Sequence, residues 1–167
     1  MKNKKNKEFK IGTIVVYPNH GVGEIKGIES LEIENIKTKF YVVQMEQDKL
    51  MIRVPLDKQD EVGLRKIASK RILSNIFNVL RLKPKIRRIM WSRRAQEYDA
   101  KIFSGDPVKI AEVIRDLFRK NNQPEQSYSE RQMFQVAIER LAREVAAVEK
   151  TDYFQATEKI EHALINK

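Results

Sequence analysis

Residues that commonly carry catalysis are sparse in this chain. Its two histidines, His20 and His162, lie far apart in the sequence, and neither has a carboxylate at the spacing of a catalytic triad or a metal site. His20 falls in a Pro-Asn-His-Gly stretch that is typical of a turn. The chain has no cysteine, which excludes disulfides, thiol catalysis and cysteine-ligated zinc. We therefore expect no catalytic residue and no metal site.

Two other motifs that could bind or transform a ligand are weak. Gly21-Val22-Gly23 resembles a fragment of a phosphate-binding loop, but it lacks the Gly-Lys-Ser/Thr ending and continues into a predicted strand. The carboxylates of Asp57, Asp60 and Glu61 are interpreted as a solvated edge. The sequence thus predicts neither an enzyme nor a cofactor.

The strongest chemical signal is a basic stretch at residues 81–101, with eight lysines or arginines, two acids and the only tryptophan of the chain, Trp91. The whole chain carries a net charge of +10. Nucleic acid suits a dense cationic patch around a large flat ring, because phosphates pair with the cations and bases or sugars pack on the ring. The candidate DNA-binding residues are Trp91, Arg93, Arg94, Arg87, Arg88 and Lys85.

Charge is unevenly spread along the rest of the chain. Residues 8–66 hold nine basic and ten acidic side chains, whereas a lysine-rich tail, expected to be disordered, occupies residues 1–7. Localised positive charge favours a defined contact over general adhesion to polyanions. No apolar run reaches the ~18 residues that span a bilayer, so we expect a cytoplasmic protein without a membrane partner.

Two interpretations of Trp91 stay open at this point. With Ser92 as N-cap, Trp91 lies just outside a helix and Arg93 and Arg94 lie in its first turn, where the helix dipole disfavours cations unless an anion is bound. With a helix that starts near Ile86, Trp91 instead joins an apolar stripe and belongs to the core. The first interpretation makes Trp91 an exposed wedge against DNA.

The elements that position these residues change character after residue 66. Residues 11–17, 22–29, 40–45 and 50–54 are rich in β-branched and aromatic residues and are separated by Gly, Pro or polar turns, which predicts a small five-stranded barrel or strongly bent sheet. The apolar spacing then becomes helical over residues 67–82, 92–103, 107–120, 128–149 and from 152 onwards. The caps expected are Asp106, Ser127 and Asp152. We expect an α+β protein of two domains, residues 8–66 and 67–167.

Several motifs together resemble the CarD/CdnL family of bacterial transcription regulators. They are Phe9-Lys10-Ile11-Gly12, Val15-Val16-Tyr17-Pro18, His20-Gly21-Val22-Gly23, Ile52-Arg53-Val54-Pro55, Val62-Gly63-Leu64-Arg65, Trp91-Ser92-Arg93-Arg94 and Ser104-Gly105-Asp106 with Ala111-Glu112-Val113-Ile114-Arg115-Asp116-Leu117. The resemblance runs in order from Phe9 to the C-terminus. Each motif is weak alone, but the set is specific.

The resemblance implies a Tudor-like N-terminal domain that binds the β subunit of bacterial RNA polymerase, with Arg53, Ile52 and Met51 at the contact. It also implies a helical C-terminal domain that contacts promoter DNA, largely independently of sequence, at the upstream edge of the transcription bubble. Trp91 would then be a minor-groove wedge that stabilises the open complex, with Arg93 and Arg94 facing DNA. Leu31 and Gln96 replace basic residues found in some relatives.

We therefore expect a monomeric, non-enzymatic transcription regulator that is associated with the nucleoid through the polymerase. The alternative is a general nucleic-acid-binding architectural protein without a polymerase partner. A protein-interaction adaptor with Trp91 in its core is a third possibility.

Overall fold

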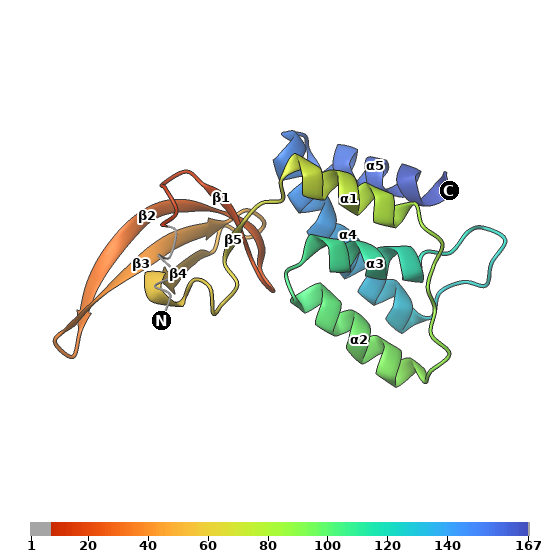
Figure 1. Cartoon of the computed structure of the whole chain (residues 1–167), viewed down its shortest axis with the longest axis horizontal. Coiled ribbons are helices and arrows are strands. Elements are labelled where there is room, and N and C mark those ends of the chain that lie inside the picture. The colour runs from red at the N-terminus through yellow and green to blue at the C-terminus, as the bar shows by residue number, and fades with distance from the viewer. Residues whose placement is uncertain (1–7, 167) are drawn as a thin grey trace. The chain divides into compact units, whose positions relative to one another are not determined.

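The computed structural model describes residues 8–166, so the lysine-rich tail expected at residues 1–7 lies outside the described residues. The chain divides into two compact units between Ile67 and Ala68. Strands occupy the first unit and helices the second (Figure 1). The predicted α+β class, with a five-stranded sheet followed by five helices, is confirmed.

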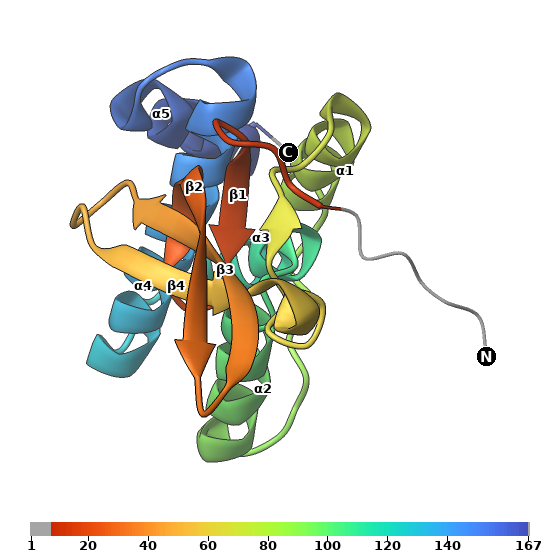
Figure 2. The ribbon, with the colours of Figure 1, turned by 90° about the vertical axis from the view of Figure 1, so that its left-hand side faces the viewer.

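The first unit is a single antiparallel sheet with the strand order β4-β3-β2-β1-β5 (Figure 2). Strand β4 therefore forms one edge and β5 the other. The strands are β1 (Ile14–Tyr17), β2 (Gly21–Ile33), β3 (Ile36–Met45), β4 (Met51–Pro55) and β5 (Arg65–Lys66), with a 3₁₀ turn at Leu56–Lys58.

The core of the sheet follows from alternation along its strands. Val15, Ile25 and Val43 are fully buried on one face, and Tyr41 packs beside the ring of Phe9 at 5.5 Å between centroids. The backbone N–H of Phe9 donates to the Tyr41 hydroxyl oxygen at 2.9 Å, which satisfies that buried polar group. Burial raises the pKa of Tyr41, so its hydroxyl stays neutral at physiological pH.

The hairpin of β2 and β3 is longer than the sequence predicts. The expected strands covered residues 22–29 and 40–45, whereas pairing continues to Ile33 opposite Ile36. Glu34 and Asn35 close the hairpin with φ angles of 51° and 64°, the two left-handed residues of a tight hairpin turn. The first strand, in contrast, is shorter than predicted. The expected strand covered residues 11–17, whereas β1 begins only at Ile14, after a turn.

Gly23 allows the close approach of β2 and β3. A Cβ atom at this position would lie 2.9 Å from the carbonyl oxygen of Gln44, which belongs to the backbone and cannot rotate away. We expect Gly23→Ala to lower the free energy of unfolding by about 1–3 kcal/mol, the usual cost of overpacking, as measured by urea denaturation. Gly27→Ala is the matched control, because a Cβ there meets nothing within 4 Å. Equal stability of the two variants would contradict this explanation.

The second unit is a five-helix domain with one continuous core. Its helices are α1 (Lys70–Leu80), α2 (Trp91–Phe103), α3 (Pro107–Leu117), α4 (Tyr128–Glu149) and α5 (Tyr153–Ile165). Helix α3 is the most enclosed, since Ala111, Val113, Ile114 and Leu117 are fully buried. It packs against α1, α2 and α4, and α5 covers α1 and α4.

Capping residues set most of the helix ends where the sequence predicts them. The side chains of Asp106, Ser127 and Asp152 each accept a hydrogen bond from a first-turn N–H of α3, α4 and α5. Other predicted ends were wrong. Helix α1 begins at Lys70 because the Ser69 hydroxyl caps it, and α3 ends at Leu117 because Phe118 adopts an extended backbone.

Candidate nucleic-acid interface

The basic stretch consists of an irregular segment, residues 81–90, and most of helix α2. The side chains of Lys85, Arg87 and Arg88 are exposed along the segment. One hydrogen bond ties its middle to the domain, because the backbone N–H of Lys85 donates to Asp116 Oδ1 at 2.8 Å. The segment is thus held to α3 at the residue that follows Pro84.

Asp116 can hold the segment because it is itself fixed. It is almost fully buried, and its Oδ1 also accepts from Nε of the adjacent, equally buried Arg115 at 2.8 Å. A buried carboxylate needs both a counter-charge and hydrogen-bond donors. Arg115 supplies the charge and Lys85 the second donor, so the α3 core and the basic stretch are joined at one atom.

Helix α2 begins one residue before the predicted start. Met90 is the N-cap and forms no side-chain capping bond, so the expectation that Ser92 caps the helix was wrong. The carbonyl oxygen of Met90 accepts from the N–H groups of Arg93 and Arg94, both at 3.1 Å. The first turn holds no acid. Its positive end therefore combines the helix dipole with two arginines, which favours a nearby anion.

Trp91 is the first residue of α2, and its burial lies between that of an exposed wedge and that of a core residue. It is partly buried, packs on the edge of the domain core and lies 6.3 Å from the ring of Tyr98. The apolar stripe expected for a core tryptophan is therefore present, yet part of the indole remains accessible. The indole is thus anchored to the domain core and partly accessible to solvent.

Arg94 is held by the same two rings. Its guanidinium carbon lies 5.4 Å from the centroid of Trp91 and 5.6 Å from that of Tyr98, and Nη2 donates to the Tyr98 hydroxyl oxygen at 3.2 Å. These cation–π contacts restrict both the arginine and the indole. Arg94 therefore orients Trp91, whereas the neighbouring Arg93 is exposed.

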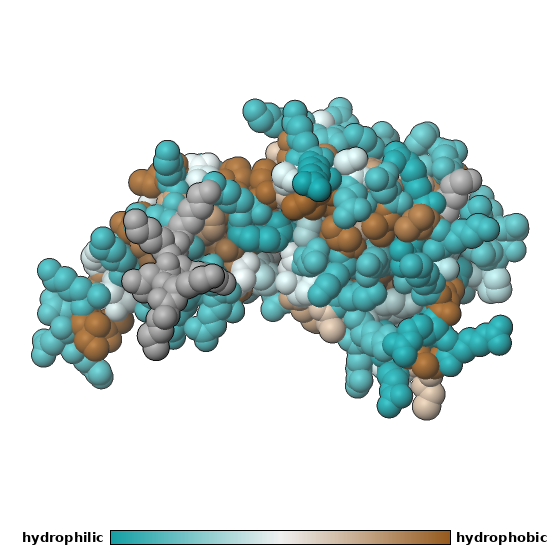
Figure 3. Space-filling view, viewed as in Figure 1, coloured by the Kyte–Doolittle hydropathy of each residue, from teal (hydrophilic) through white to brown (hydrophobic). Residues whose placement is uncertain are grey.

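The remaining cations of the stretch differ in what they contact. Arg87 pairs with Glu97 at 2.6 Å. Within residues 8–166, no carboxylate lies within salt-bridge distance of Lys83, Lys85, Arg88 or Arg93. Figure 3 shows hydrophilic side chains gathered at the N-terminal end of α2. An exposed ion pair such as Arg87–Glu97 contributes about 0–1 kcal/mol and can exchange for a phosphate.

Two apolar residues beside Trp91 were missed in the sequence. Met90 is 77% exposed and Ile86 is 47% exposed, although both are large hydrophobic side chains. Apolar residues embedded in a run of cations are the signal that could have found them. Together with Trp91 they place apolar surface among the cations, as a wedge against base edges or sugars requires.

The predicted polymerase-binding residues lie on the edge strand β4. Met51 and Arg53 are exposed, and Ile52 packs partly against the core of the sheet, as alternation requires. Arg53 Nε lies 2.9 Å from Glu29 Oε2 on β2, with both side chains about half exposed. The pairing of Phe40 with both Glu29 and Pro55 places Glu29 on the same face as Arg53.

That face carries three exposed apolar residues, of which only Leu31 was named from the sequence. Leu31, Ile33 and Ile36 are 43%, 55% and 66% exposed. Leu31 and Ile33 follow Glu29 at alternate positions on β2, so they share its face. The outer part of the β2–β3 hairpin thus presents an apolar surface next to Arg53.

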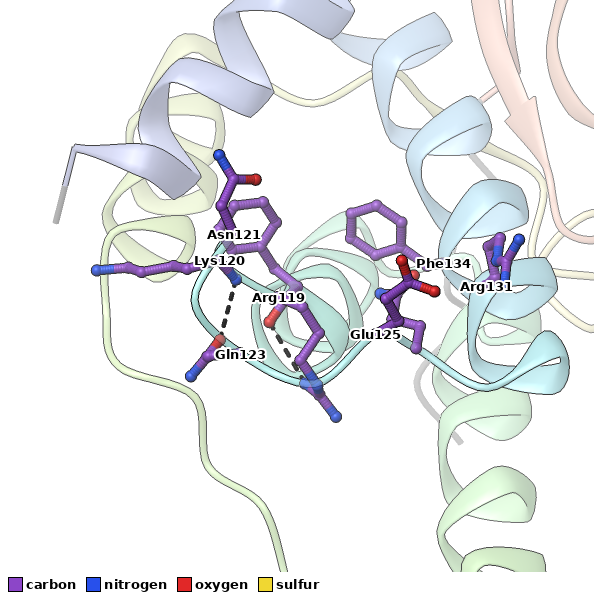
Figure 4. Close-up of a pocket in the computed structure, with 9 residues that line it drawn as sticks. Arg119, Lys120, Asn121, Gln123, Glu125, Arg131 and Phe134 are labelled. Carbon is purple, nitrogen blue, oxygen red and sulfur yellow. Dashed lines mark hydrogen bonds between the residues drawn. The ribbon is translucent and has the colours of Figure 1, made fainter.

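Catalytic and metal-binding chemistry finds little support in the geometry. His20 stacks on Tyr17 at 5.0 Å, and the part of the chain that the structure describes holds no cluster of three potential metal ligands. A cavity of about 420 Å³ beside the loop between α3 and α4 is lined by Arg119, Lys120 and Phe134 among others (Figure 4). Its one carboxylate, Glu125, has no second acid or histidine beside it in the lining. No helix among the described residues is long and apolar enough to cross a membrane.

Comparison with known proteins gives two family matches that follow the division of the chain. Residues 9–68 match the CarD-like/TRCF RID domain, and residues 75–161 match the CarD C-terminal domain. The Bacillus subtilis (strain 168) protein named "Putative transcription factor YdeB" is 30% identical over 140 residues, which cover 84% of this chain and 92% of that protein.

Two solved structures from Myxococcus xanthus are similar to part of this chain. CdnLNt is 41% identical, with 38% of this chain and 90% of that one covered and a TM-score of 0.33. The 72-residue N-terminal domain of CarD is 35% identical, with 37% and 83% covered and a TM-score of 0.32. The two family matches and the B. subtilis relative together show that this chain belongs to the CarD family of transcription regulators.

Proposed function

We propose that this protein binds the β subunit of bacterial RNA polymerase through its sheet and stabilises the open promoter complex through the N-terminal end of α2. The observation that carries the proposal is the partly accessible indole of Trp91, held by Arg94, in a stretch whose cations Arg88 and Arg93 are exposed. In this proposal the protein acts in the cytoplasm, on the nucleoid, as a monomer.

The helical domain suits a distorted DNA junction better than a regular duplex. Arg93, Arg88 and Lys85 can contact phosphates, which positions a protein without reading sequence. Trp91 and Met90 can pack against a base step that is already unstacked at the bubble edge. A regular duplex offers the phosphates but not the unstacked base step. The protein therefore binds the opened junction more tightly than the closed duplex.

That difference is what shifts the promoter equilibrium. A ligand changes an equilibrium only by its differential affinity for the two states. A tenfold shift towards the open complex needs about 1.4 kcal/mol, which is within reach of one partly accessible indole. Tethering to the polymerase raises the effective concentration of the helical domain at the junction, so its affinity for isolated DNA can be low.

The sheet supplies the tether in this proposal. Strand β4 is an edge strand, which another chain can extend by main-chain hydrogen bonds. Met51, Arg53 and the apolar residues Leu31, Ile33 and Ile36 lie on one face beside it. The near-neutral charge of residues 8–66 agrees with a protein partner rather than with DNA.

Arg53→Glu is expected to weaken binding to the isolated β lobe of the polymerase at least tenfold, about 1.4 kcal/mol. The substitution removes a cation from the proposed contact and leaves a carboxylate beside Glu29, so a partner surface that complements the cation would meet two acids instead. Biolayer interferometry with the full-length protein measures the effect. Lys39→Glu is the control, because it makes the same charge change at an exposed residue of β3 that lies on the opposite face of the sheet from Arg53.

The alternative is a general nucleic-acid-binding architectural protein, which the cationic end of α2 would also suit. The same experiment separates the two functions. If the wild-type protein does not bind the β lobe but still shifts bulk DNA, the architectural function replaces the proposed one.

A further inference from the structure

The helical domain has a second cationic site on a different side from Trp91. A groove of about 700 Å³ lies between α1 and the junction of α4 and α5. No residue of α2 lines it, and α1 packs on α3, α4 and α5, whereas α2 packs on α3 and α4. Figure 1 shows α1 and α5 on one side of this domain and α2 on the other. The lining residues are Lys70, Leu73, Ser74, Phe77, Arg81, Val148, Glu149, Lys150 and Lys159.

The charges of this groove are unbalanced. Four of its lining residues are cationic, and its only acid, Glu149, is neutralised by Lys159, whose Nζ lies 2.5 Å from Glu149 Oε1. Within the described residues, Lys70, Arg81 and Lys150 have no carboxylate at salt-bridge distance. The backbone at Lys150 is fixed, because this residue is the left-handed C-cap of α4 and its N–H donates to Ala146. The groove therefore has a positive rim that the domain itself does not neutralise.

The floor of the groove is apolar. Leu73 and Phe77 are buried core residues, and Val148 is partly buried beside them. Arg81 and Lys159 lie over the Phe77 ring, at 6.0 Å and 5.1 Å from its centroid. Such a contact orients the Arg81 guanidinium without using its N–H donors, so these donors stay available to a bound anion, whereas Lys159 is paired with Glu149.

The length of the groove argues for an extended ligand. Lys70 begins α1 and Arg81 is its C-cap, so about 16 Å separates them at 1.5 Å per residue. One compact anion cannot reach both ends, whereas a chain with several negative charges can. A sugar–phosphate backbone would supply the charges but no aliphatic side chain for the floor of Leu73 and Val148. A peptide with acidic and aliphatic residues supplies both.

We propose that this groove docks an acidic segment of another protein. An aliphatic side chain of the segment occupies the floor over Leu73 and Val148, and its carboxylates pair with Lys70, Arg81 and Lys150. The site is separate from the proposed DNA contact at Trp91 and does not depend on it.

Titration of the ¹⁵N-labelled full-length protein with a synthetic peptide of alternating glutamate and leucine tests the proposal. We expect saturable chemical-shift changes at the amides of Ser74, Val148 and Lys150. Lys70→Glu/Lys150→Glu should weaken the binding at least tenfold, about 1.4 kcal/mol. The variant should stay folded, because the helix dipole favours the new negative charge at the start of α1 and disfavours the one at the end of α4, so the two effects on stability offset each other.

A charge-matched variant and two further probes make the result specific. Lys109→Glu/Lys120→Glu carries the same charge change at exposed positions outside the groove and should change the affinity less than about threefold, roughly 0.6 kcal/mol. The same peptide with serine in place of leucine should bind several-fold more weakly. The proposal would be overturned if the titration did not saturate, if both double variants weakened binding equally, or if the serine peptide bound with the same affinity. Tighter binding of oligodeoxythymidine in the groove would assign it to nucleic acid instead.

Discussion

Open promoter complexes formed with the Trp91→Ala variant are expected to decay about tenfold faster than those formed with the wild-type protein, while the variant stays folded. The proposed indole contact exists only at the opened junction, so its removal lowers the differential affinity by about 1.4 kcal/mol. Competitor-challenged decay of a ribosomal-type promoter complex measures the lifetime. Trp91→Phe retains an apolar ring and should give an intermediate lifetime.

Because Trp91 also packs on the core, its loss costs stability as well. It is only partly buried, so we expect a loss below the ~3–5 kcal/mol that accompanies removal of a fully buried aromatic residue. Val108→Ala is the control, since Val108 is a partly buried residue on the same core. It should lower stability without shortening the lifetime. An unfolded Trp91→Ala domain would support the adaptor alternative, and an unchanged lifetime would reject the wedge.

Asp116→Ala is expected to lower the free energy of unfolding of the helical domain by about 3–5 kcal/mol, the cost of breaking a buried ion pair from one side. The substitution leaves Arg115 charged and buried and removes the acceptor of the Lys85 N–H. Urea denaturation measures the loss. Asp99→Ala is the control, because Asp99 is exposed on α2 and its removal should change stability by less than about 0.5 kcal/mol.

The same variant tests whether Asp116 holds the basic stretch in place. Hydrogen exchange should accelerate at the Lys85 amide, which loses its acceptor. In Arg115→Met/Asp116→Ala no buried charge is left, so part of the stability should return while exchange at Lys85 stays fast. Slow exchange at Lys85 in both variants would show that the segment is fixed by other contacts.

Local signals in the sequence suffice for the order and type of most elements. β-branched residues between turn residues predict the strands of the first unit, and the helical period begins after them. The capping side chains of Asp106, Ser127 and Asp152 act on N–H groups within three residues, so their effect can be read from neighbouring positions. The cap at Ser69 was overlooked, so the predicted start of α1 at residue 67 lies three residues too early. The start of α2, which no side chain caps, was misplaced by one residue.

The hairpin of β2 and β3 shows how a local signal can be overlooked. Its turn at Glu34 and Asn35 contains no glycine, and charged residues alternate with the apolar ones on either side of it. The pairing of Ile33 with Ile36 nevertheless extends both strands. Ile33 and Ile36 of the proposed polymerase-binding face were missed for the same reason.

The basic stretch marks the boundary between local and long-range information. Its density of cations and its single tryptophan are visible in the sequence and point to nucleic acid without further help. Which cations are engaged depends on residues distant in sequence or one helical turn away: Arg87 pairs with Glu97, Arg94 lies between Trp91 and Tyr98, and the Lys85 N–H reaches Asp116. The contacts of Arg94 follow the helical spacing within α2. The Arg87–Glu97 pair and the Lys85–Asp116 hydrogen bond have no periodic signature, because they form only when the irregular segment lies against α2 and α3. The tertiary structure therefore decides which cations of the stretch are engaged, so that Arg94 holds the indole of Trp91 while others remain exposed to solvent.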